Sequence, residues 1–425
     1  MLVSELTLDW SIRTPATTIG PMTAPLPASS MPQILNAQSI KILLIRIFPK
    51  RNESFLVAST LISPLRVEMT STERIKKLIE ILREGGLTGA ILRSQANVFY
   101  FTGYRGSGAL FIPTDGLPTL YVPPLDFELA EEMAAEEVQV IKLEQHSTIQ
   151  SIFESIPEHS RARLGFDSLS AEDYLKISER LAGSMTPISD RIWKLRMIKD
   201  DSEIDRIKRA CEISSRCMEL ASEIIGQGVA ESEIKAEILK EMLNLGGEKP
   251  AFDIIVASGP NSSKPHGSPG NRLIRSGDVV VIDIGAVYEG YCSDMTRTFY
   301  VGSEPSEEVE KAHQAVLDAK QKAEEFLKIG ATASDLYQSA YDQLASTGYG
   351  EHFIHGLGHG VGIEIHEPPR ISRNVGEVLS EGMVLTIEPG VYFPKRFGVR
   401  VEDTILVRRE GVERLTRAPY ELSLD

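Results

Sequence analysis

The chain has 425 residues, of which 42% are hydrophobic and 25% charged, an ordinary composition for a soluble globular protein. Its 60 Asp and Glu residues outnumber its 45 Lys and Arg residues, and the formal net charge of −15 argues against binding to nucleic acid or anionic lipid. Three cysteines (Cys211, Cys217 and Cys292) are too few for a disulfide framework and are typical of a reducing compartment. No uncharged apolar run of about 18 residues is present. We expect a soluble, cytoplasmic protein with at least two domains.

The first 68 residues differ in composition from the rest. They hold 7 of the 23 prolines and only 10 charged residues, and they follow neither a helical nor a strand period. An apolar stretch at 40–48 is interrupted by Lys41 and Arg46, so it is too short and too charged for a membrane helix. We expect 1–68 to be a poorly ordered or misassigned extension, with the functional chain beginning at Met69.

Residues 69–190 combine short strands with amphipathic helices. Ile75, Leu78, Ile79 and Leu82 recur at helical spacing and form one apolar stripe. Strands are predicted in the segments GAILR, NVFYFTG, ALFIP, TLYVPP and VQVIKLE, and further helices at 126–136 and 171–181. This alternation predicts an α/β domain with a supporting role, because it contains no cluster of metal ligands or nucleophiles.

Residues 191–425 are predicted to form a second, α+β domain. After a strand-like or irregular start, RIWKLRM, a helix is expected from about Asp201 and a second one at 232–245. Strands follow in AFDIIVAS, DVVVIDIGAVY and DMTRTFYVG, then helices at 307–328 and 333–346 and a strand-rich block at 360–409. Grouped helices and strands favour antiparallel pairing over a βαβ arrangement.

Histidines are concentrated in this second domain. Six of the eight lie between residues 266 and 366, and four of these between 352 and 366. The segment HGLGHGVGIEIH, from His355 to His366, contains so much glycine that it argues against a continuous helix and for closely packed backbone. The two histidines four residues apart, His355 and His359, therefore do not indicate a zinc-protease helix.

Acidic residues interrupt hydrophobic strands at several places. Asp283 and Asp294 are 11 residues apart, on either side of a turn at Glu289-Gly290. In a hairpin symmetric about Tyr288 and Glu289, they face each other on neighbouring strands, with Cβ atoms about 5 Å apart. Two carboxylates this close repel each other unless a cation lies between them.

Glu388 and Glu402 are likewise single carboxylates at the ends of apolar strands. Any one of the four acids could be a core acid in a salt bridge, but four such residues beside a glycine-wrapped histidine favour a metal site. Four carboxylates and one imidazole form an oxygen-rich set that suits two divalent ions of the Mn, Co or Fe type. Such a two-metal site activates water and polarises a carbonyl, which indicates hydrolysis.

These motifs resemble the pita-bread metallopeptidases (family M24), which include methionine aminopeptidase, aminopeptidase P, prolidase and the metal-free creatinase. The resemblance runs from Met69 to Asp425 and includes the linker LRMIKDDSEI. It implies a creatinase-like α/β domain at 69–190 followed by a pita-bread catalytic domain at 191–425. It also implies five ligands for two divalent ions, Mn²⁺ or Co²⁺ before Fe²⁺ or Zn²⁺: Asp283, Asp294, His359, Glu388 and Glu402. His313 and His352 match no family position and are expected at the surface.

The resemblance also implies roles around the ligands. His266 matches a loop histidine that contacts substrate near the scissile bond, and His366 one that stabilises the tetrahedral intermediate. Glu388 matches the proton shuttle between the attacking water and the leaving nitrogen. His355 and Arg400 match positions that either support the ligands from behind or line the substrate pocket.

The complete ligand set argues against a creatinase, and the N-terminal domain argues against methionine aminopeptidase. We therefore expect cleavage of the Xaa-Pro bond, with Arg370 binding the free carboxylate of a dipeptide. A solvated loop arginine is the alternative for Arg370. The alternatives for the protein are an aminopeptidase P acting on longer peptides, a hydrolase or lyase of the same fold, and a protein-binding module without activity. The family also suggests a homodimer and gives no reason to expect nucleic acid or a membrane as partner.

Overall fold

The computed structural model describes residues 69–144, 149–181 and 183–423, and the predictions for 1–68 lie outside them. Among the described residues, no helix combines the length and the apolar character needed to cross a membrane.

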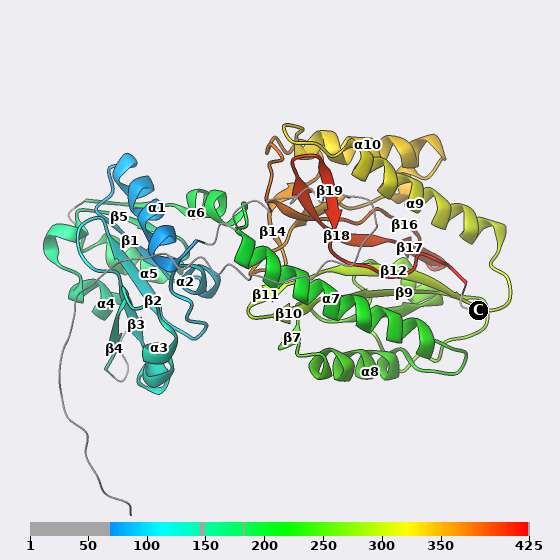
Figure 1. Cartoon of the computed structure of the whole chain (residues 1–425), viewed down its shortest axis with the longest axis horizontal. Coiled ribbons are helices and arrows are strands. Elements are labelled where there is room, and N and C mark those ends of the chain that lie inside the picture. The colour runs from blue at the N-terminus through cyan, green and yellow to red at the C-terminus, as the bar shows by residue number, and fades with distance from the viewer. Residues whose placement is uncertain (1–68, 145–148, 182, 424–425) are drawn as a thin grey trace, which may run out of the picture. The chain divides into compact units, whose positions relative to one another are not determined.

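The N-terminal part is built on a mixed six-stranded sheet with the strand order β4-β3-β2-β1-β5-β6 (Figure 1). The strands β1, β5 and β6 are parallel to one another, whereas β2 runs antiparallel to both of its neighbours. The strands are β1 (Gly89–Leu92), β2 (Ala109–Pro113), β3 (Thr119–Val122), β4 (Gln139–Lys142), β5 (Arg163–Phe166) and β6 (Ser184–Pro187).

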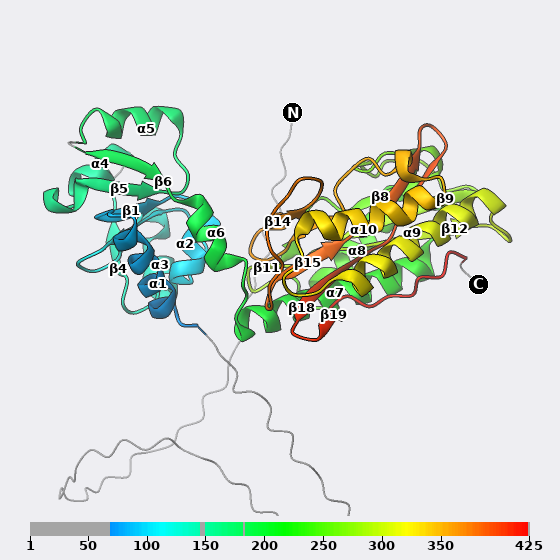
Figure 2. The same ribbon diagram turned by 90° about the horizontal axis from the view of Figure 1, so that it is seen from above.

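Helices cover both faces of this sheet, as the two views show (Figures 1 and 2). The helices α1 (Ser71–Glu84), α2 (Gln95–Thr102), α3 (Phe127–Met133) and α6 (Ser189–Arg196) share one hydrophobic core, to which α1 contributes Leu78 and Leu82. The helices α4 (Ile149–Ser155) and α5 (Ala171–Ser178) pack on the other face. Two short 3-10 helices complete this part, η1 (Pro124–Asp126) and η2 (Glu158–Arg161).

Two local predictions are wrong. The segment NVFYFTG lies in α2, which begins after Ser94, whose side chain accepts a hydrogen bond from the backbone N–H of Asn97, and ends at Gly103 in the left-handed conformation. The segment RIWKLRM lies mostly in α6 and not in a strand. Aromatic and β-branched residues favour strands only weakly, so end caps and burial on the adjacent sheet decide the outcome.

The C-terminal part is an α+β domain, as expected. Helices α7 (Asp201–Ile224) and α8 (Glu231–Asn244) lie on one side of its strands, and α9 (Glu307–Phe326) and α10 (Ala333–Ser346) on the other (Figure 1). The main sheet has the order β14-β13-β15-β18-β12-β9-β8, with β19 paired to β18. Its strands are β8 (Ile255–Ser258), β9 (Asp278–Ile284), β12 (Met295–Val301), β13 (Gly358–Gly360), β14 (Glu367–Ile371), β15 (Val384–Ile387), β18 (Glu402–Arg408) and β19 (Gly411–Arg414).

Smaller elements join these strands. The strands β7 (Lys249–Pro250), β10 (Ala286–Tyr288) and β11 (Tyr291–Cys292) form a three-stranded sheet, and β16 (Gly390–Phe393) pairs with β17 (Phe397–Arg400). The 3-10 helices are η3 (Gly259–Ser263) and η4 (Gly350–His352).

The predicted hairpin exists, but its turn is centred one residue later, which shifts the strand pairing by two residues. Tyr288 pairs with Tyr291, and both turn residues between them have positive φ, as a two-residue hairpin requires. Asp283 consequently pairs with Thr296 and does not face Asp294. The two aspartates are diagonal neighbours on the same pair of strands, so the expectation that they lie directly across from each other was wrong.

Neither of the two histidines expected at the surface is fully exposed. His313 lies in α9 and is only 6% exposed. Burial and, secondarily, the charge of Arg297 lower the pKa of His313 to about 4, so it is neutral in the folded protein. His352 is half-buried against the ring of Phe393. The expectation of surface positions is therefore wrong: His313 is buried and His352 is half-buried.

A buried ionic cluster joins α9 to the main sheet. The carboxylate of Asp403 in β18 accepts hydrogen bonds from Arg297 at 2.8 Å, Thr416 at 2.8 Å and Tyr420 at 2.5 Å, and it pairs with Lys320 of α9 at 2.6 Å. Burial alone raises the pKa of Asp403, but the two cations hold it at about 2. Because four donors satisfy this buried carboxylate, it is stable as an anion.

Removing one cation from this cluster tests its contribution to stability. The Lys320 side chain is 3% exposed, so we expect Lys320→Met to lower the free energy of unfolding by about 3 kcal/mol, because it removes one of the two cations that pair with the buried Asp403 and also the pair with the buried Glu324. Lys311→Met on the same helix breaks a pair with Glu307 whose lysine is 65% exposed, and we expect a loss below about 1 kcal/mol. Urea unfolding measures both values. Equal losses would contradict a special role for the buried cluster.

Candidate metal centre

Five neighbouring strands of the C-terminal sheet carry the five predicted ligands. In the strand order β13-β15-β18-β12-β9, His359 lies in β13, Glu388 directly follows β15, and Glu402 begins β18. Asp294 directly precedes β12, and Asp283 is the penultimate residue of β9. Residues that are distant in the sequence are therefore brought to one region because their strands are adjacent.

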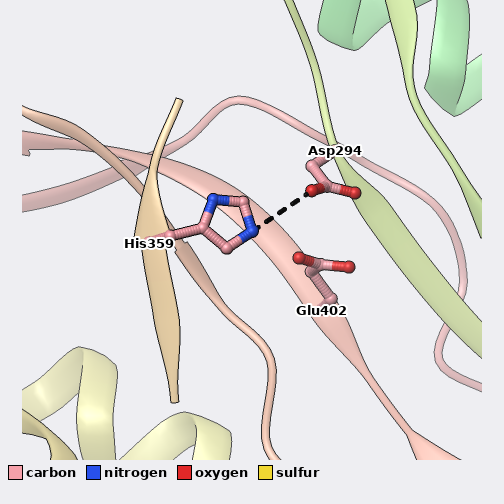
Figure 3. A group of neighbouring side chains, drawn as sticks. All are labelled: Asp294, His359 and Glu402. Carbon is pink, nitrogen blue, oxygen red and sulfur yellow. Dashed lines mark ion pairs between the residues drawn. The ribbon is translucent and has the colours of Figure 1, made fainter. Parts of the chain in front are cut away.

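Three of these side chains converge closely. One ligand atom each from Asp294, His359 and Glu402 lies within 4.8 Å of the others, and all three residues are buried (Figure 3). The Nε2 atom of His359 is 3.5 Å from Oδ2 of Asp294 and 3.5 Å from Oε1 of Glu388. Asp283 is close enough for its charge to affect the other carboxyl groups, so all five residues border one region.

The carboxyl groups raise one another's pKa values. Burial and the charges of Glu402, Asp283 and Glu388 raise the pKa of Asp294 well above its ordinary value. Burial, with the charges of Glu388 and Asp283, has the same effect on the pKa of Glu402. Burial also raises the pKa of Glu388 to about 7, although Arg400 acts in the opposite direction. The cluster lacks enough positive charge for all its carboxylates to be ionised together.

The residues present fit divalent cations. The Oδ1 atoms of Asp283 and Asp294 are buried and have no hydrogen-bond partner. Burial lowers the pKa of His359 to about 4, so its imidazole is neutral, and its Nδ1 lies 3.0 Å from the carbonyl oxygen of Gly360. With Nδ1–H donating to that carbonyl, the lone pair of Nε2 is directed toward the acids. Carboxylate oxygens and one imidazole are ligands for hard or borderline dications.

Arg400 connects the acids to an aromatic side chain that sequence reasoning missed. Its guanidinium donates to Oδ2 of Asp283 at 2.5 Å and to the hydroxyl of Tyr392 at 2.9 Å. The same hydroxyl lies 3.1 Å from Nε2 of His355. Arg400 and His355 therefore belong to one hydrogen-bonded chain that ends at Asp283. No sequence signal marked Tyr392, which reads as an ordinary strand aromatic.

Thr296 is a second residue that the motifs did not reveal. Its hydroxyl donates to Oε2 of Glu402 at 2.7 Å and lies 3.1 Å from Nε of Arg400. Thr296 pairs with Asp283 across the hairpin, so a correct prediction of the register would have identified it as a neighbour of a predicted ligand. Thr296 thus fixes the orientation of one carboxylate in the cluster.

The other predicted site residues surround this cluster and are exposed. The ring of His366 lies 4.4 Å from that of His359, centroid to centroid. Arg370 is the cross-strand partner of His359 in β14, and its charge helps to lower the pKa of both histidines. His266 lies in the segment between β8 and β9, and its charge affects His355 and His366. The structure thus brings all ten predicted residues into one neighbourhood.

Comparison with known proteins gives consistent matches over both parts of the chain. Residues 205–409 match the model of metallopeptidase family M24, and residues 74–198 match the Creatinase/Prolidase N-terminal domain. An Xaa-Pro dipeptidase from Pyrococcus furiosus is 42% identical over 354 residues, which are 82% of this chain and 99% of that protein.

Solved structures show the same similarity. The prolidase from Pyrococcus furiosus superimposes with a TM-score of 0.75 at 41% identity, covering 80% of this chain and 99% of that one. An X-Pro aminopeptidase from Thermotoga maritima gives a TM-score of 0.76 at 34% identity, covering 82% and 99%.

Binding of a divalent cation should release protons. Because burial and the neighbouring carboxylates raise the pKa values of Asp294 and Glu402, their protonated forms are favoured in the metal-free protein, and we expect a bound cation to displace those protons. We expect the apparent affinity for Mn²⁺ to rise as the pH rises from 6 to 8, with proton release seen by calorimetry in buffers of different ionisation enthalpy. Asp294→Asn should weaken binding at least about 10-fold.

The exposed Asp253 supplies the control, since Asp253→Asn removes one negative charge from a solvent-exposed side chain that is none of the predicted ligands. We expect this variant to bind Mn²⁺ as the unmodified protein does. A pH-independent affinity would contradict the displacement of protons by the cation, and equal binding by both variants would exclude Asp294 as a ligand.

Proposed function

The chain belongs to metallopeptidase family M24, with the Creatinase/Prolidase N-terminal domain and the pita-bread fold of that family, and we propose that it is an Xaa-Pro dipeptidase. Relatives named Xaa-Pro dipeptidase or prolidase, about 40% identical over most of the chain, support this activity. The main structural observation in support of this activity is that the buried acids Asp294 and Glu402 converge with the neutral His359 in a chain of that family. The proposed domains are 69–190 and 191–425.

Five residues are the proposed ligands of two divalent cations: Asp283, Asp294, His359, Glu388 and Glu402. When bound, two such cations activate water as a nucleophile and polarise the substrate carbonyl. The oxygen-rich donor set supports Mn²⁺ or Co²⁺ as the ions. The orphaned Oδ1 atoms of the two aspartates support the same assignment, because a buried acceptor without a partner is costly unless a ligand occupies it.

The Xaa-Pro bond makes a particular demand on proton transfer. Its leaving nitrogen carries no hydrogen, so it must be protonated as the bond breaks. Glu388, half-buried at the border of the cluster, is the proposed group that takes the proton of the attacking water and delivers it to this nitrogen. His366, exposed beside His359, is proposed to donate its N–H to the oxygen on which negative charge develops.

The remaining residues are proposed to bind and orient the peptide. His266 would contact the substrate near the scissile bond, and His355 and Arg400 would shape the pocket through their bonds to Tyr392. Arg370 projects from β14 beside His359, where its guanidinium can bind the free carboxylate of a dipeptide.

We further propose a cytoplasmic homodimer. The three cysteines, Cys211, Cys217 and Cys292, are all free and buried, which supports a reducing compartment. On the N-terminal domain, the exposed side chains of Leu125 and Leu129 offer apolar surface for association. The proposed substrates are proline-containing dipeptides, with short peptides as the alternative.

Peptide hydrolysis tests the activity directly. Metal-free protein refilled with Mn²⁺ or Co²⁺ should cleave Ala-Pro or Met-Pro faster than an Xaa-Pro-Xaa tripeptide, measured by release of the N-terminal amino acid. The metal-free protein is the control and should be inactive. Preference for the tripeptide would instead establish an aminopeptidase, which the similarity to the Thermotoga maritima structure makes the second candidate. No cleavage of either peptide would favour a different substrate or a binding role.

Arg370 provides the test of dipeptide specificity. Because a bidentate contact to a carboxylate is worth about 1.5–3 kcal/mol, Arg370→Ala should lower kcat/KM for the dipeptide about 10- to 100-fold and change tripeptide cleavage much less. Arg373→Ala is the matched control, since that arginine contacts Tyr337 and Tyr341. Equal losses on both peptides would remove Arg370 as the carboxylate-binding residue.

A further inference from the structure

The loop that carries His266 has little regular structure of its own. We call residues 259–270 the His266 loop. It begins with the 3-10 helix η3, contains no strand, and exposes His266 near its middle. A segment of this kind can hold a side chain in place only if other parts of the fold fix it.

One buried carboxylate binds both ends of this loop. Glu231, the first residue of α8, is fully buried. Its Oε1 accepts hydrogen bonds from the backbone N–H of Ser258 at 2.8 Å, from the Ser258 hydroxyl at 2.7 Å and from Nδ2 of Asn261 at 3.2 Å. Its Oε2 accepts from the backbone N–H of Gly270 at 3.1 Å. A single side chain thus ties the start of the loop to its end.

The buried carboxylate of Glu231 is itself stabilised by these hydrogen bonds. Within the described residues, no Lys or Arg forms an ion pair with it, because the nearby Arg272 pairs with Asp278 at 2.6 Å. The donors of Ser258 and of the loop, the N-terminus of α8 and the nearby charge of Arg272 compensate its buried charge. Moving the loop away would break the hydrogen bonds that Asn261 and Gly270 donate to this buried carboxylate, so the buried charge opposes such movement.

Arg400, at the candidate metal centre, contacts the middle of the loop. Arg400, which bonds Asp283, also donates to the carbonyl oxygen of Pro265 at 3.2 Å. The backbone N–H of Gly398 donates to the hydroxyl of Ser262 at 3.0 Å. The residue before His266 is therefore held by the same guanidinium that holds a predicted ligand, while Glu231 holds the two ends.

From this arrangement we propose that Glu231 is a positioning residue for His266. It lies 35 positions before His266 in the sequence, outside every predicted site motif, and acts on catalysis only by fixing the His266 loop. The inference rests on the proposed peptidase function for its kinetic consequences. The holding of the loop itself does not depend on that function.

The variant Glu231→Gln keeps the shape of the side chain but replaces one acceptor oxygen with an NH₂ group, which faces N–H donors in this site. We expect kcat/KM for Ala-Pro to fall about 10- to 100-fold, since a displacement of about 1 Å can have that effect. Mn²⁺ affinity should stay unchanged, because the loop carries no predicted metal ligand. Glu237→Gln is the control, as Glu237 is exposed on the same helix and pairs with Lys240; it should retain full activity.

A double-mutant cycle separates positioning from general structural damage. If Glu231 acts through His266, then Glu231→Gln in a His266→Ala background should cost less than about 3-fold. Losses that multiply in full would overturn the proposal. Should Glu231→Gln fail to fold, Asn261→Ala removes one of the same hydrogen bonds from the loop side and is put through the same cycle.

Amide hydrogen exchange gives a measurement that needs no substrate. We expect faster exchange in Glu231→Gln confined to residues 258–270, with unchanged exchange in β9 and β12. Unchanged exchange in the loop would overturn the proposal even if activity fell. Faster loop exchange in a protein that cleaves neither peptide would support the holding role and reject the proposed function alone.

Discussion

Mutual repulsion among carboxylates at the centre of the C-terminal sheet is the constraint around which this domain is built. Asp283, Asp294 and Glu402 are buried on three neighbouring strands, and Glu388 borders them. Arg400 forms an ion pair with Asp283, but its single positive charge cannot neutralise four carboxylates. The sheet holds the acids together through its backbone hydrogen bonds and apolar core, so the cluster remains in an arrangement that added positive charge stabilises.

Two successive residues of β18 show how specific this arrangement is. Asp403 meets Arg297 and Lys320, and its pKa is held at about 2. Glu402, one residue earlier and on the other face of the strand, meets other carboxylates, and its pKa is raised well above the ordinary value. The fold thus places two cations against Asp403, whereas Glu402 lies among carboxylates with Arg400 as a nearby positive charge. The opposite pKa shifts of these two neighbouring residues therefore come from the side chains around each of them and not from their strand.

Several features followed from local patterns. The helices expected from about Asp201, at 232–245, at 307–328 and at 333–346 correspond closely to α7 to α10, and the acids that interrupt apolar strands marked the candidate metal centre by their positions in the chain alone. The turn at Glu289-Gly290 was identified, but the predicted pairing was two residues out of register, because the spacing of the two aspartates does not fix the centre of the hairpin. The aromatic residues of α2 favour a strand by composition, whereas the helix caps at Ser94 and Gly103 favour the helix that forms.

The sequence by itself determined the helices of the C-terminal domain and indicated the residue types of the candidate metal centre, because both leave local signals, in residue spacing and in charged residues within apolar strands. Only the tertiary structure decided which strands are neighbours, that Tyr392 joins Arg400 to His355, and that Glu231 binds both ends of the His266 loop. These are contacts between segments far apart in the chain. Their residues are ordinary in their local context, and their role arises from the partner that folding places beside them.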